Sequence, residues 1–326
     1  MPYFMIGTQR SGSNLLRVML DQSPHIVAPH PPHFLERLSP LKPLYGDLSQ
    51  SKNFARLVDD VCLLIETNPV SWSLGPLDRD YIASLCTEPS LVAVSFAVHD
   101  VLARHNHAQN WVCKSLGNVH ILDEIERFGG NDAKYIHLHR DGRDVALSFK
   151  KAIVGEKTSY HIAQQWKDEQ AKALAHGAKV GPDRFISVSY FGLVTQPQHE
   201  LIRLCDFMDI QFQPEMLEFH RSKEAQTTSK AGQMWSNVSR PVMAGNVQNF
   251  LSDSDPANLA VFEAIAGDML TRLGYPLVNG FNEENERLKK KALASADPDD
   301  LLKRRAQSEL MAQIKHRLLN GQRDVA

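Results

Sequence analysis

The stretch MIGTQRSGSNLLRVML (residues 5–20) has the spacing of a phosphate-binding loop set between a strand and a helix. A short apolar run over residues 3–6 ends at Gly7, and a helical pattern of apolar residues begins at residue 15. Gly7 and Gly12 have the spacing G-x-x-x-x-G. Because a phosphate loop requires this order of strand, glycine turn and helix, the stretch predicts an α/β fold with an anion site at the loop.

The loop lacks the Lys-Ser/Thr pair that normally follows the second glycine. Ser13 and Asn14 occupy those positions, and Arg10 lies inside the loop. Backbone N–H groups at a helix start converge on an anion, and arginine adds a permanently charged planar fork. The loop does not provide the metal-bridged phosphate geometry of ATPases and kinases. We therefore predict a metal-free anion site; the alternative is a tight turn without a ligand, and the adjacent Arg-Ser-Gly-Ser favours binding.

A second anion site is predicted in the segment KYIHLHRDGRDVALSF. Arg140 stands at the end of an alternating strand pattern, and Ser148 follows eight residues later on a helical pattern. Since ligands collect at the carboxyl ends of parallel strands, Arg140 and the first loop are expected to face one crevice. Asp141 and Asp144 have the spacing of helix caps, and Arg143 is assigned either to a surface ion pair or to ligand contact. Two separated anion sites imply a ligand with two separated phosphate groups.

Strand and helix patterns alternate along the chain. Strands are expected at residues 3–6, 25–28, 111–114, 134–139 and 184–190. Helices are expected at residues 15–20, 53–67, 77–86, 90–103, 118–128, 143–151, 159–175 and 198–208. This alternation predicts a three-layer α/β/α fold of the P-loop type, with a central, mainly parallel sheet, helical insertions and a helical C-terminal tail.

The domain organisation follows from a change in composition after residue 280. Residues 1–280 are expected to form the phosphate-binding domain, with a helical insertion at 46–110 that, with 154–180, shapes the acceptor side. Residues 281–326 form a charged helical extension. Its apolar stripe predicts either docking on the same chain or a homodimer contact, and comprises Leu302, Ala306, Leu310, Ile314 and Leu318.

Composition excludes several classes of protein. The chain has 326 residues, a formal net charge of -2 and 43% hydrophobic residues, so nothing favours nucleic acid as a partner. Four scattered cysteines suit reduced thiols. The first residues are too short for a signal segment, and no apolar run is long enough to span a membrane. We therefore expect a soluble, cytoplasmic protein.

Three motifs together resemble a known enzyme family. GTQRSGSNLLRVMLDQSP resembles the 5′-phosphosulfate loop of sulfotransferases that use 3′-phosphoadenosine 5′-phosphosulfate (PAPS). YIHLHRDGRDVALSF resembles their 3′-phosphate motif, and FISVSYFGLVTQP the later strand whose tyrosine lies near the nucleotide. The motifs occur in the family's order over residues 3–208. The arginine in the first loop is closer to the tyrosylprotein and bacterial branches than to the cytosolic branch.

The resemblance implies a PAPS-dependent transferase (EC 2.8.2 type) that releases 3′,5′-ADP and needs no metal. It implies that the 5′-phosphosulfate is held by Arg10, Ser11, Gly12, Ser13 and Asn14. It assigns Arg140 and Ser148 to the 3′-phosphate, places Tyr190 close by, and gives Arg240 a late phosphate contact. Lys114, in WVCKSLGN, matches a lysine that approaches the transferred group. With Arg10, it would neutralise charge on the departing phosphate.

The general base is expected in the stretch APHPPHFLE. Lys114 is not followed by the histidine that cytosolic members use, but this stretch offers His30, His33 and Glu36. A histidine suits base chemistry near neutral pH, so His33 is the predicted base, with His30 and Glu36 as alternatives. Structural roles within strands and helices are expected for His120, His137 and His139.

Two other functions compete with sulfuryl transfer. One is a P-loop kinase or NTPase with a degenerate loop, for which Asp141 is the obvious residue to hold Mg²⁺. The other is a nucleotide-binding module without catalysis. If the chain is a sulfotransferase, a small-molecule, lipid or sugar hydroxyl is the expected acceptor, because no basic tract favours a heparin-like polymer.

Overall fold

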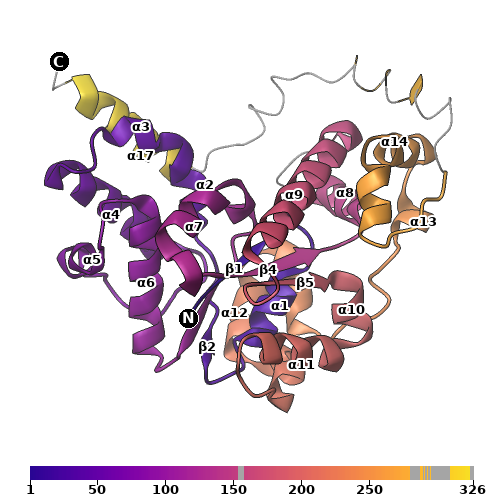
Figure 1. Cartoon of the computed structure of the whole chain (residues 1–326), viewed down its shortest axis with the longest axis horizontal. Coiled ribbons are helices and arrows are strands. Elements are labelled where there is room, and N and C mark those ends of the chain that lie inside the picture. Colours follow the sequence, from indigo (N-terminus) through magenta and orange to yellow (C-terminus); the bar gives the residue numbers. More distant parts are fainter. Residues whose placement is uncertain are drawn as a thin grey trace.

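Five parallel strands form one sheet at the centre of the molecule (Figure 1). The computed structural model describes residues 1–152, 158–279 and 309–323, with residues 287, 288, 290, 292 and 294. The spatial order is β2-β3-β1-β4-β5, and the strands are β1 (Pro2–Ile6), β2 (Ile26–Val27), β3 (Asn110–Cys113), β4 (Lys134–His139) and β5 (Phe185–Ser189). The predicted parallel sheet is confirmed.

Helices cover both faces of this sheet. The α-helices of the described residues are α1 (Ser13–Leu20), α2 (Phe34–Leu38), α3 (Lys42–Tyr45), α4 (Ser51–Glu66), α5 (Arg79–Leu85), α6 (Leu91–His105), α7 (Leu122–Gly129), α8 (Gly142–Lys151), α9 (Ser159–Val180), α10 (Tyr190–Thr195), α11 (Pro197–Phe207), α12 (Lys223–Ala231), α13 (Phe250–Asp253), α14 (Pro256–Arg272) and α17 (Glu309–Arg323). Short 3-10 helices are η1 (Ser39–Leu41), η2 (Leu116–His120), η3 (Gly130–Asp132), η4 (Pro214–Arg221) and η5 (Gln233–Ser239).

Two helices differ from their expected form. The helix expected at 118–128 is divided into η2 and α7, because Ile121 between them takes non-helical angles (φ −130°, ψ 24°). The helix expected at 159–175 continues to Val180, where Gly181 adopts a φ of 81° and ends it. A positive φ costs glycine little, so it is a common residue immediately after a helix.

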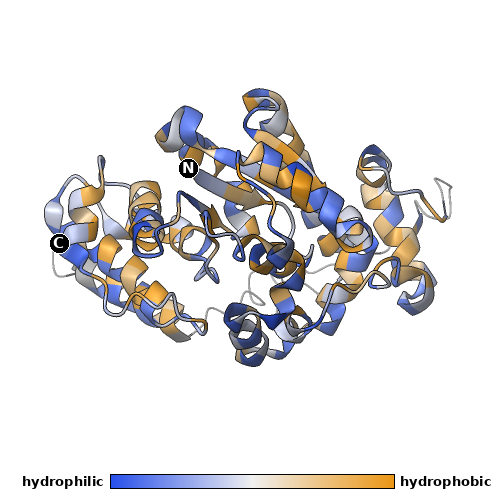
Figure 2. Ribbon diagram, turned by 90° about the horizontal axis from the view of Figure 1, so that it is seen from below, coloured by the Kyte–Doolittle hydropathy of each residue, from blue (hydrophilic) through white to orange (hydrophobic). Residues whose placement is uncertain are grey.

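Alternating residues of β1 pack into two separate cores. Phe4 and Ile6 join the core formed with α4, α5, α6 and α7, whereas Tyr3 and Met5 join the core formed with α1 and α11. Successive strand side chains point to opposite faces, so one buried strand supports both layers. Figure 2 shows polar and apolar residues alternating along the surrounding helices, as expected for helices with one buried side.

Two glycines are required in the loop that follows β1. Gly7 has a φ of 136°, and a Cβ there would collide with the carbonyl of Leu138 in β4. Gly12, at the start of α1, has a φ of 93°, and a Cβ there would collide with the ring of Tyr190. The spacing G-x-x-x-x-G therefore reflects two close approaches, one to the neighbouring strand and one to α10.

The C-terminal helix α17 packs on its own chain, beside α3 (Figure 1). Met311, Ile314 and Leu318 are buried in the same core as the apolar residues of α4. This arrangement matches the docking interpretation of the apolar stripe, and dimerisation through the helix stays a prediction. Leu302 and Ala306 of that stripe lie outside the described residues.

Candidate active site

One cavity of about 1360 Å³ collects the residues singled out in the sequence. It lies where β1, β3 and β4, which are neighbours in the sheet, reach their carboxyl ends. Because parallel strands end at the same edge, the loops after them meet there. The predicted residues that line the cavity are Arg10, Gly12, Ser13, Asn14, His30, His33, Glu36, Lys114, Arg140, Ser148, Tyr190 and Arg240. The crevice expected between the two anion motifs is therefore present.

The loop between Gly7 and Gly12 has the geometry of an anion-binding turn. Arg10 adopts a left-handed backbone (φ 72°), which is uncommon for a residue with a side chain. No side chain caps the start of α1, so its first N–H groups remain available to a ligand. Ser11 is buried, and its Oγ has no hydrogen-bond partner among the described residues.

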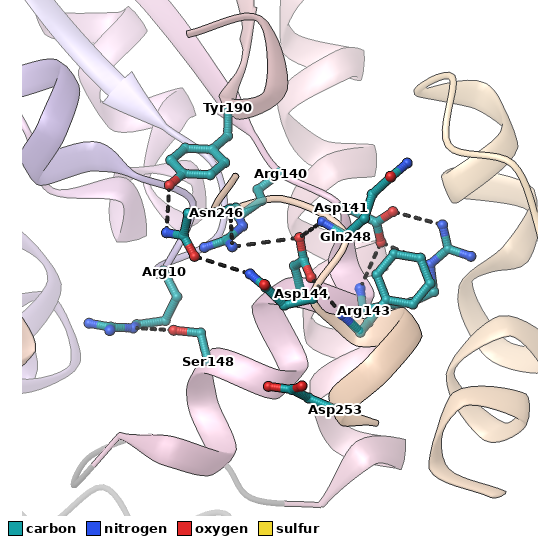
Figure 3. A network of polar contacts seen from close by, with 12 residues as sticks. Arg10, Arg140, Asp141, Arg143, Asp144, Ser148, Tyr190, Asn246, Gln248 and Asp253 are labelled. Atoms are coloured by element: carbon teal, nitrogen blue, oxygen red, sulfur yellow. Dashed lines mark hydrogen bonds and ion pairs between the residues drawn. The ribbon is translucent and has the colours of Figure 1, made fainter. Parts of the chain in front are cut away.

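Arg10 contacts a residue of the second motif. Its Nε donates to the Oγ of Ser148, 3.0 Å away (Figure 3). Burial and the nearby Arg140 lower the pKa of Arg10, as expected for two like charges that lie close together. The two anion motifs are thus in direct contact and line one cavity.

Arg140 is held by a hydrogen bond, an ion pair with Asp144 (3.5 Å) and a ring contact, and its Nε is left without a partner in the described structure. Its Nη2 donates to the carbonyl of Asn246 at 3.0 Å, and its Cζ lies 4.4 Å from the centre of the Tyr190 ring. The Nε of Arg140 is buried without a partner among the described residues. A buried unpaired donor next to a cavity favours an acceptor on a ligand.

The segment 233–249 forms a wall of the cavity, of which the sequence motifs indicated only Arg240. Asn246 donates from Nδ2 to the Oη of Tyr190 at 2.9 Å. Asp144 accepts the backbone N–H groups of Gln248 (2.8 Å) and Phe250 (3.0 Å), and so fixes the end of this segment on α8 (Figure 3). The segment carries no strand or helix periodicity, and its position depends on residues about a hundred positions earlier in the chain.

Asp144 and Arg143 differ from their expected roles, whereas Asp141 does not. Asp141 caps α8 by accepting the N–H of Arg143 at 3.0 Å. Asp144 holds the late segment instead of capping a helix. Arg143 is buried and paired with Asp141 (2.7 Å) and Glu263 (2.5 Å), so it is neither a surface ion pair nor a cavity residue.

Lys114 follows β3 and is 8% exposed. Its ammonium group lines the cavity and makes no hydrogen bond within the described part of the chain. Burial, together with the charges of Arg17 and Arg10, lowers the pKa of Lys114 to about 7. A bound anion would relieve this repulsion and favour the charged form.

His33 and Glu36 approach each other on the cavity wall. The Nδ1 of His33 lies 3.7 Å from the Oε2 of Glu36. His33 has a left-handed backbone (φ 57°) immediately before α2. Burial and the nearby Lys114 hold its pKa well below the usual 6.5. Gly117 leaves the space that Glu36 occupies, because a Cβ there would contact its carboxylate at 2.5 Å.

His30 is more constrained than His33. Its Nδ1 lies 3.3 Å from the Nδ2 of Asn68, and its ring packs edge-on against Trp235 with centroids 4.6 Å apart. Burial, followed by the charge of Lys114, lowers the pKa of His30 to about 3. Its Nε2 is buried without a partner in the described structure.

The other three histidines have the structural roles expected for them. His137 hydrogen-bonds Ser187 (3.0 Å) and Gln170 (2.7 Å), and His139 hydrogen-bonds Tyr275 (2.8 Å). The remaining one, His120, pairs with Glu169 at 3.0 Å. Gln170 also donates to Thr8 (3.0 Å), so hydrogen bonds connect His137 through Gln170 to the loop after β1.

The remaining expectations concern the cavity's rim and walls. Arg240 is exposed at the rim. Leu64 and the turn 67–69 of the predicted insertion line the cavity, but the described part of 154–180 contributes no lining residue. Among the described residues, no group of three or more His, Cys, Asp or Glu could hold a metal ion. No helix in the described part of the chain is long and apolar enough to cross a membrane.

Comparison with known proteins identifies the family. A sulfotransferase family model matches residues 2–214, more than half of the chain. The chain therefore belongs to the sulfotransferase family, as its motifs suggest. Placement near the tyrosylprotein and bacterial branches stays a prediction.

Similar proteins agree with this assignment. A protein-tyrosine sulfotransferase of Drosophila melanogaster is 23% identical over 286 residues, covering 83% of this chain and 51% of the fly protein. A Caenorhabditis elegans protein, named only provisionally for the same activity, is 31% identical over 131 residues, covering 38% of this chain and 50% of the nematode protein. The chain spans about half the length of the curated relatives it matches.

A solved structure shows the same fold. The sulfotransferase domain of the Synechococcus PCC 7002 olefin synthase superposes with a TM-score of 0.61 at 23% identity. The match covers 85% of this chain and 96% of that domain. The α/β architecture is therefore that of a sulfotransferase.

Proposed function

We propose that this chain transfers a sulfuryl group from PAPS to an acceptor hydroxyl without a metal ion. The observation that carries the proposal is one cavity lined by the phosphate loop, the Arg140–Ser148 pair, Lys114 and His33. Cationic, hydrogen-bonding and basic groups there face a shared space of about 1360 Å³. Membership of the sulfotransferase family supports the same reaction class.

The polar groups around the cavity fit a nucleotide with two phosphate sites. The Oγ of Ser11 and the Nε of Arg140 are buried without partners among the described residues, and buried polar groups are rarely left unpaired. Residues 10–14 would hold the 5′-phosphosulfate, and Arg140 with Ser148 the 3′-phosphate beside Tyr190. PAPS supplies the activated sulfuryl group, and 3′,5′-ADP is the product that remains. Arg240, exposed at the rim, is a weaker phosphate contact.

Lys114 and Arg10 supply the electrostatic stabilisation. Negative charge builds on the bridging oxygen as the phosphate departs, and fixed cations in a partly dry site stabilise it. The Lys114 ammonium has no hydrogen bond in the described structure and lines the cavity between the loop and His33. Because the pKa of Lys114 is lowered to about 7, an anionic ligand would stabilise the charged form of its amine.

His33 is proposed as the general base. Its lowered pKa keeps the imidazole neutral at pH 7, so it can accept the proton of an acceptor hydroxyl. Glu36, 3.7 Å away, would stabilise the imidazolium that forms. His30 is the less accessible base, because Asn68 lies 3.3 Å from its Nδ1 and its ring packs against Trp235. Glu36 acting directly is the remaining alternative.

The kinase alternative has less support. Mg²⁺ would need a carboxylate at the end of a strand, and Asp141 follows β4 directly. Both carboxylate oxygens of Asp141 accept hydrogen bonds from Arg143, at 2.9 Å and 2.7 Å. A carboxylate engaged in this way is not free to bind a metal.

The acceptor is proposed to be a small-molecule, lipid or sugar hydroxyl, and the location cytoplasmic. The names of the curated relatives make the phenol of a protein tyrosine a further acceptor to test. Trp72 and Trp111 are core residues and offer no stacking surface: their indole nitrogens donate to the His30 carbonyl and to Asp100. The acceptor must therefore contact other residues.

The test is transfer of labelled sulfate. The purified chain is incubated with PAPS labelled in its sulfuryl group and a cell extract, with and without EDTA, and labelled products are identified. We expect transfer that EDTA does not reduce, and calorimetric binding of 3′,5′-ADP. ATP hydrolysis that requires Mg²⁺, without 3′,5′-ADP binding, would instead indicate a kinase or NTPase. Binding of 3′,5′-ADP without transfer to any acceptor would indicate a nucleotide-binding module.

A further inference from the structure

The C-terminal helix α17 reaches the same cavity as the nucleotide motifs. Leu310 and Gln313, one helical turn apart, line the cavity. They lie beside the end of α4, which contributes Leu64 and the turn 67–69 to the lining. These two helices belong to segments separated by more than 200 residues in the chain, so their meeting at the cavity is a tertiary feature.

Apolar contacts position α17. Met311, Ile314 and Leu318 are 5%, 2% and 2% exposed and share a core with Tyr45 and Leu57. Their spacing of three and four residues places them on one side of the helix. With this side buried, Gln313 remains exposed toward the cavity.

A charge pair specifies the same position. Asp60 of α4 is fully buried and accepts a hydrogen bond from the Oη of Tyr45 at 2.7 Å. Arg317 forms an ion pair with Asp60 and lies 3.5 Å from Asp59. A buried carboxylate needs a cationic partner, because an uncompensated buried charge is strongly destabilising. The buried carboxylate of Asp60 thus has its cationic partner, Arg317, on α17.

The wall formed by α4 and α17 lies on the side of the proposed base. Asn68, directly after α4, donates to the His30 carbonyl at 2.9 Å, and His30 and His33 belong to the same loop. Arg140 and Tyr190, by contrast, are fixed to the segment around Asn246. The acceptor must approach the base, so it enters beside α4 and α17.

We propose that α17 is part of the acceptor site, with Leu310 and Gln313 in contact with an uncharged, partly apolar portion of the acceptor. The inference rests on the proposed sulfuryl transfer. The side chains of this wall carry no charge, and they are Leu64, Thr67, Asn68, Pro69, Leu310 and Gln313. Uncharged walls with a few amides and hydroxyls suit a neutral ligand and do not pair with a charged one.

The test changes the size or charge of side chains in this wall and leaves the proposed nucleotide-binding residues unaltered. Gln313→Trp adds a large ring at the cavity, and Lys315→Trp is the matched control, because Lys315 is exposed on the same helix and does not line the cavity. Leu310→Glu is a second variant, which places a charge in the wall. Each variant is compared with the unaltered chain in 3′,5′-ADP affinity and in transfer of labelled sulfate to the acceptors of a cell extract.

We expect unchanged 3′,5′-ADP affinity in all variants. We expect transfer to fall at least about tenfold in Gln313→Trp and Leu310→Glu, but not in Lys315→Trp. Unaltered transfer by both cavity variants overturns the inference while leaving sulfuryl transfer intact. Failure of the unaltered chain to transfer label overturns the proposed function, and this inference with it.

Discussion

Arg10 in the phosphate loop donates a hydrogen bond to Ser148 on α8, with 3.0 Å between Nε and Oγ. The two residues were expected at different phosphate sites, yet the structure places them in contact. This contact joins the loop after β1 to the helix after β4. If a nucleotide phosphate binds near Ser148, the hydroxyl can donate to the phosphate while it still accepts from Arg10. Alternatively, the phosphate takes the place of the hydroxyl as the acceptor of the Arg10 hydrogen bond.

Ser148→Ala should therefore affect nucleotide binding less than Arg10→Ala. The alanine at 148 removes one hydrogen bond to a charged group, worth about 1.5–3 kcal/mol, whereas the alanine at 10 removes a full positive charge together with its hydrogen bonds. Calorimetry with 3′,5′-ADP measures both. A larger loss for Ser148→Ala would show that this hydroxyl, and not Arg10, dominates the site.

Arg140→Ala should weaken 3′,5′-ADP far more than it weakens 5′-AMP, because its proposed partner is the 3′-phosphate. The loss should be about ten- to a hundredfold for 3′,5′-ADP. Asn246→Ala is the control, since Asn246 donates to Tyr190 and accepts from Arg140 through its backbone only. Equal losses for the two nucleotides would assign Arg140 to the support of the fold.

Nucleotide binding should be coupled to proton uptake by Lys114. The lowered pKa of about 7 means that the free amine is mostly neutral at pH 8. A bound phosphate raises this pKa, so binding at pH 8 should take up as much as one proton, whereas at pH 6 the group is already charged. Calorimetry in buffers of different ionisation enthalpy measures this uptake. The proposal for Lys114 is wrong if Lys114→Met takes up as many protons as the unaltered chain.

His33→Ala should lower kcat by about 10²–10⁴-fold while leaving 3′,5′-ADP affinity nearly unchanged, because the base acts on the acceptor. The pKa of His33 is depressed, so the base stays neutral as the pH falls to 6.5, and activity is lost only at lower pH. The mutant should lack this acid limb.

His30→Ala is the matched control from the same proline-rich stretch. A greater loss in His30→Ala than in His33→Ala would move the base to His30. If both variants remain active, Glu36→Gln becomes the decisive measurement, because Glu36 is the remaining carboxylate of that stretch.

Arg317→Ala should destabilise the chain, because it leaves the buried Asp60 without its cation. Leaving a buried polar group unpaired costs about 1–3 kcal/mol, and the half-exposed guanidinium places the effect toward the lower value. Adding Asp60→Asn should recover part of the loss, since an amide can still accept from Tyr45. Denaturant unfolding measures the effect, and Lys315→Ala is the control on the same helix. An Arg317→Ala chain as stable as the unaltered one would show that the ion pair does not hold α17.

Local patterns were sufficient to predict the sheet and the two motifs that meet at the cavity. The loop from Gly7 to Gly12, the strand before Arg140 and the helix that carries Ser148 are each encoded within about fifteen consecutive residues. Alternation along strands and periodicity along helices report the faces that are buried, and parallel strands bring their carboxyl ends together. The meeting of both motifs at one cavity follows from these local rules.

Only the tertiary structure placed the residues that surround these motifs. Asp144 holds Gln248, 104 residues later, and Arg317 pairs with Asp60, 257 residues earlier. Such pairs leave no periodic signal, because each partner's neighbours along the chain are unrelated to the contact. Their pairing is set by packing, since a buried carboxylate is stable only where the fold brings it N–H groups or a cation. The sequence by itself therefore determined the loop and the strand-end residues that line the cavity, whereas packing between distant segments determined its other walls.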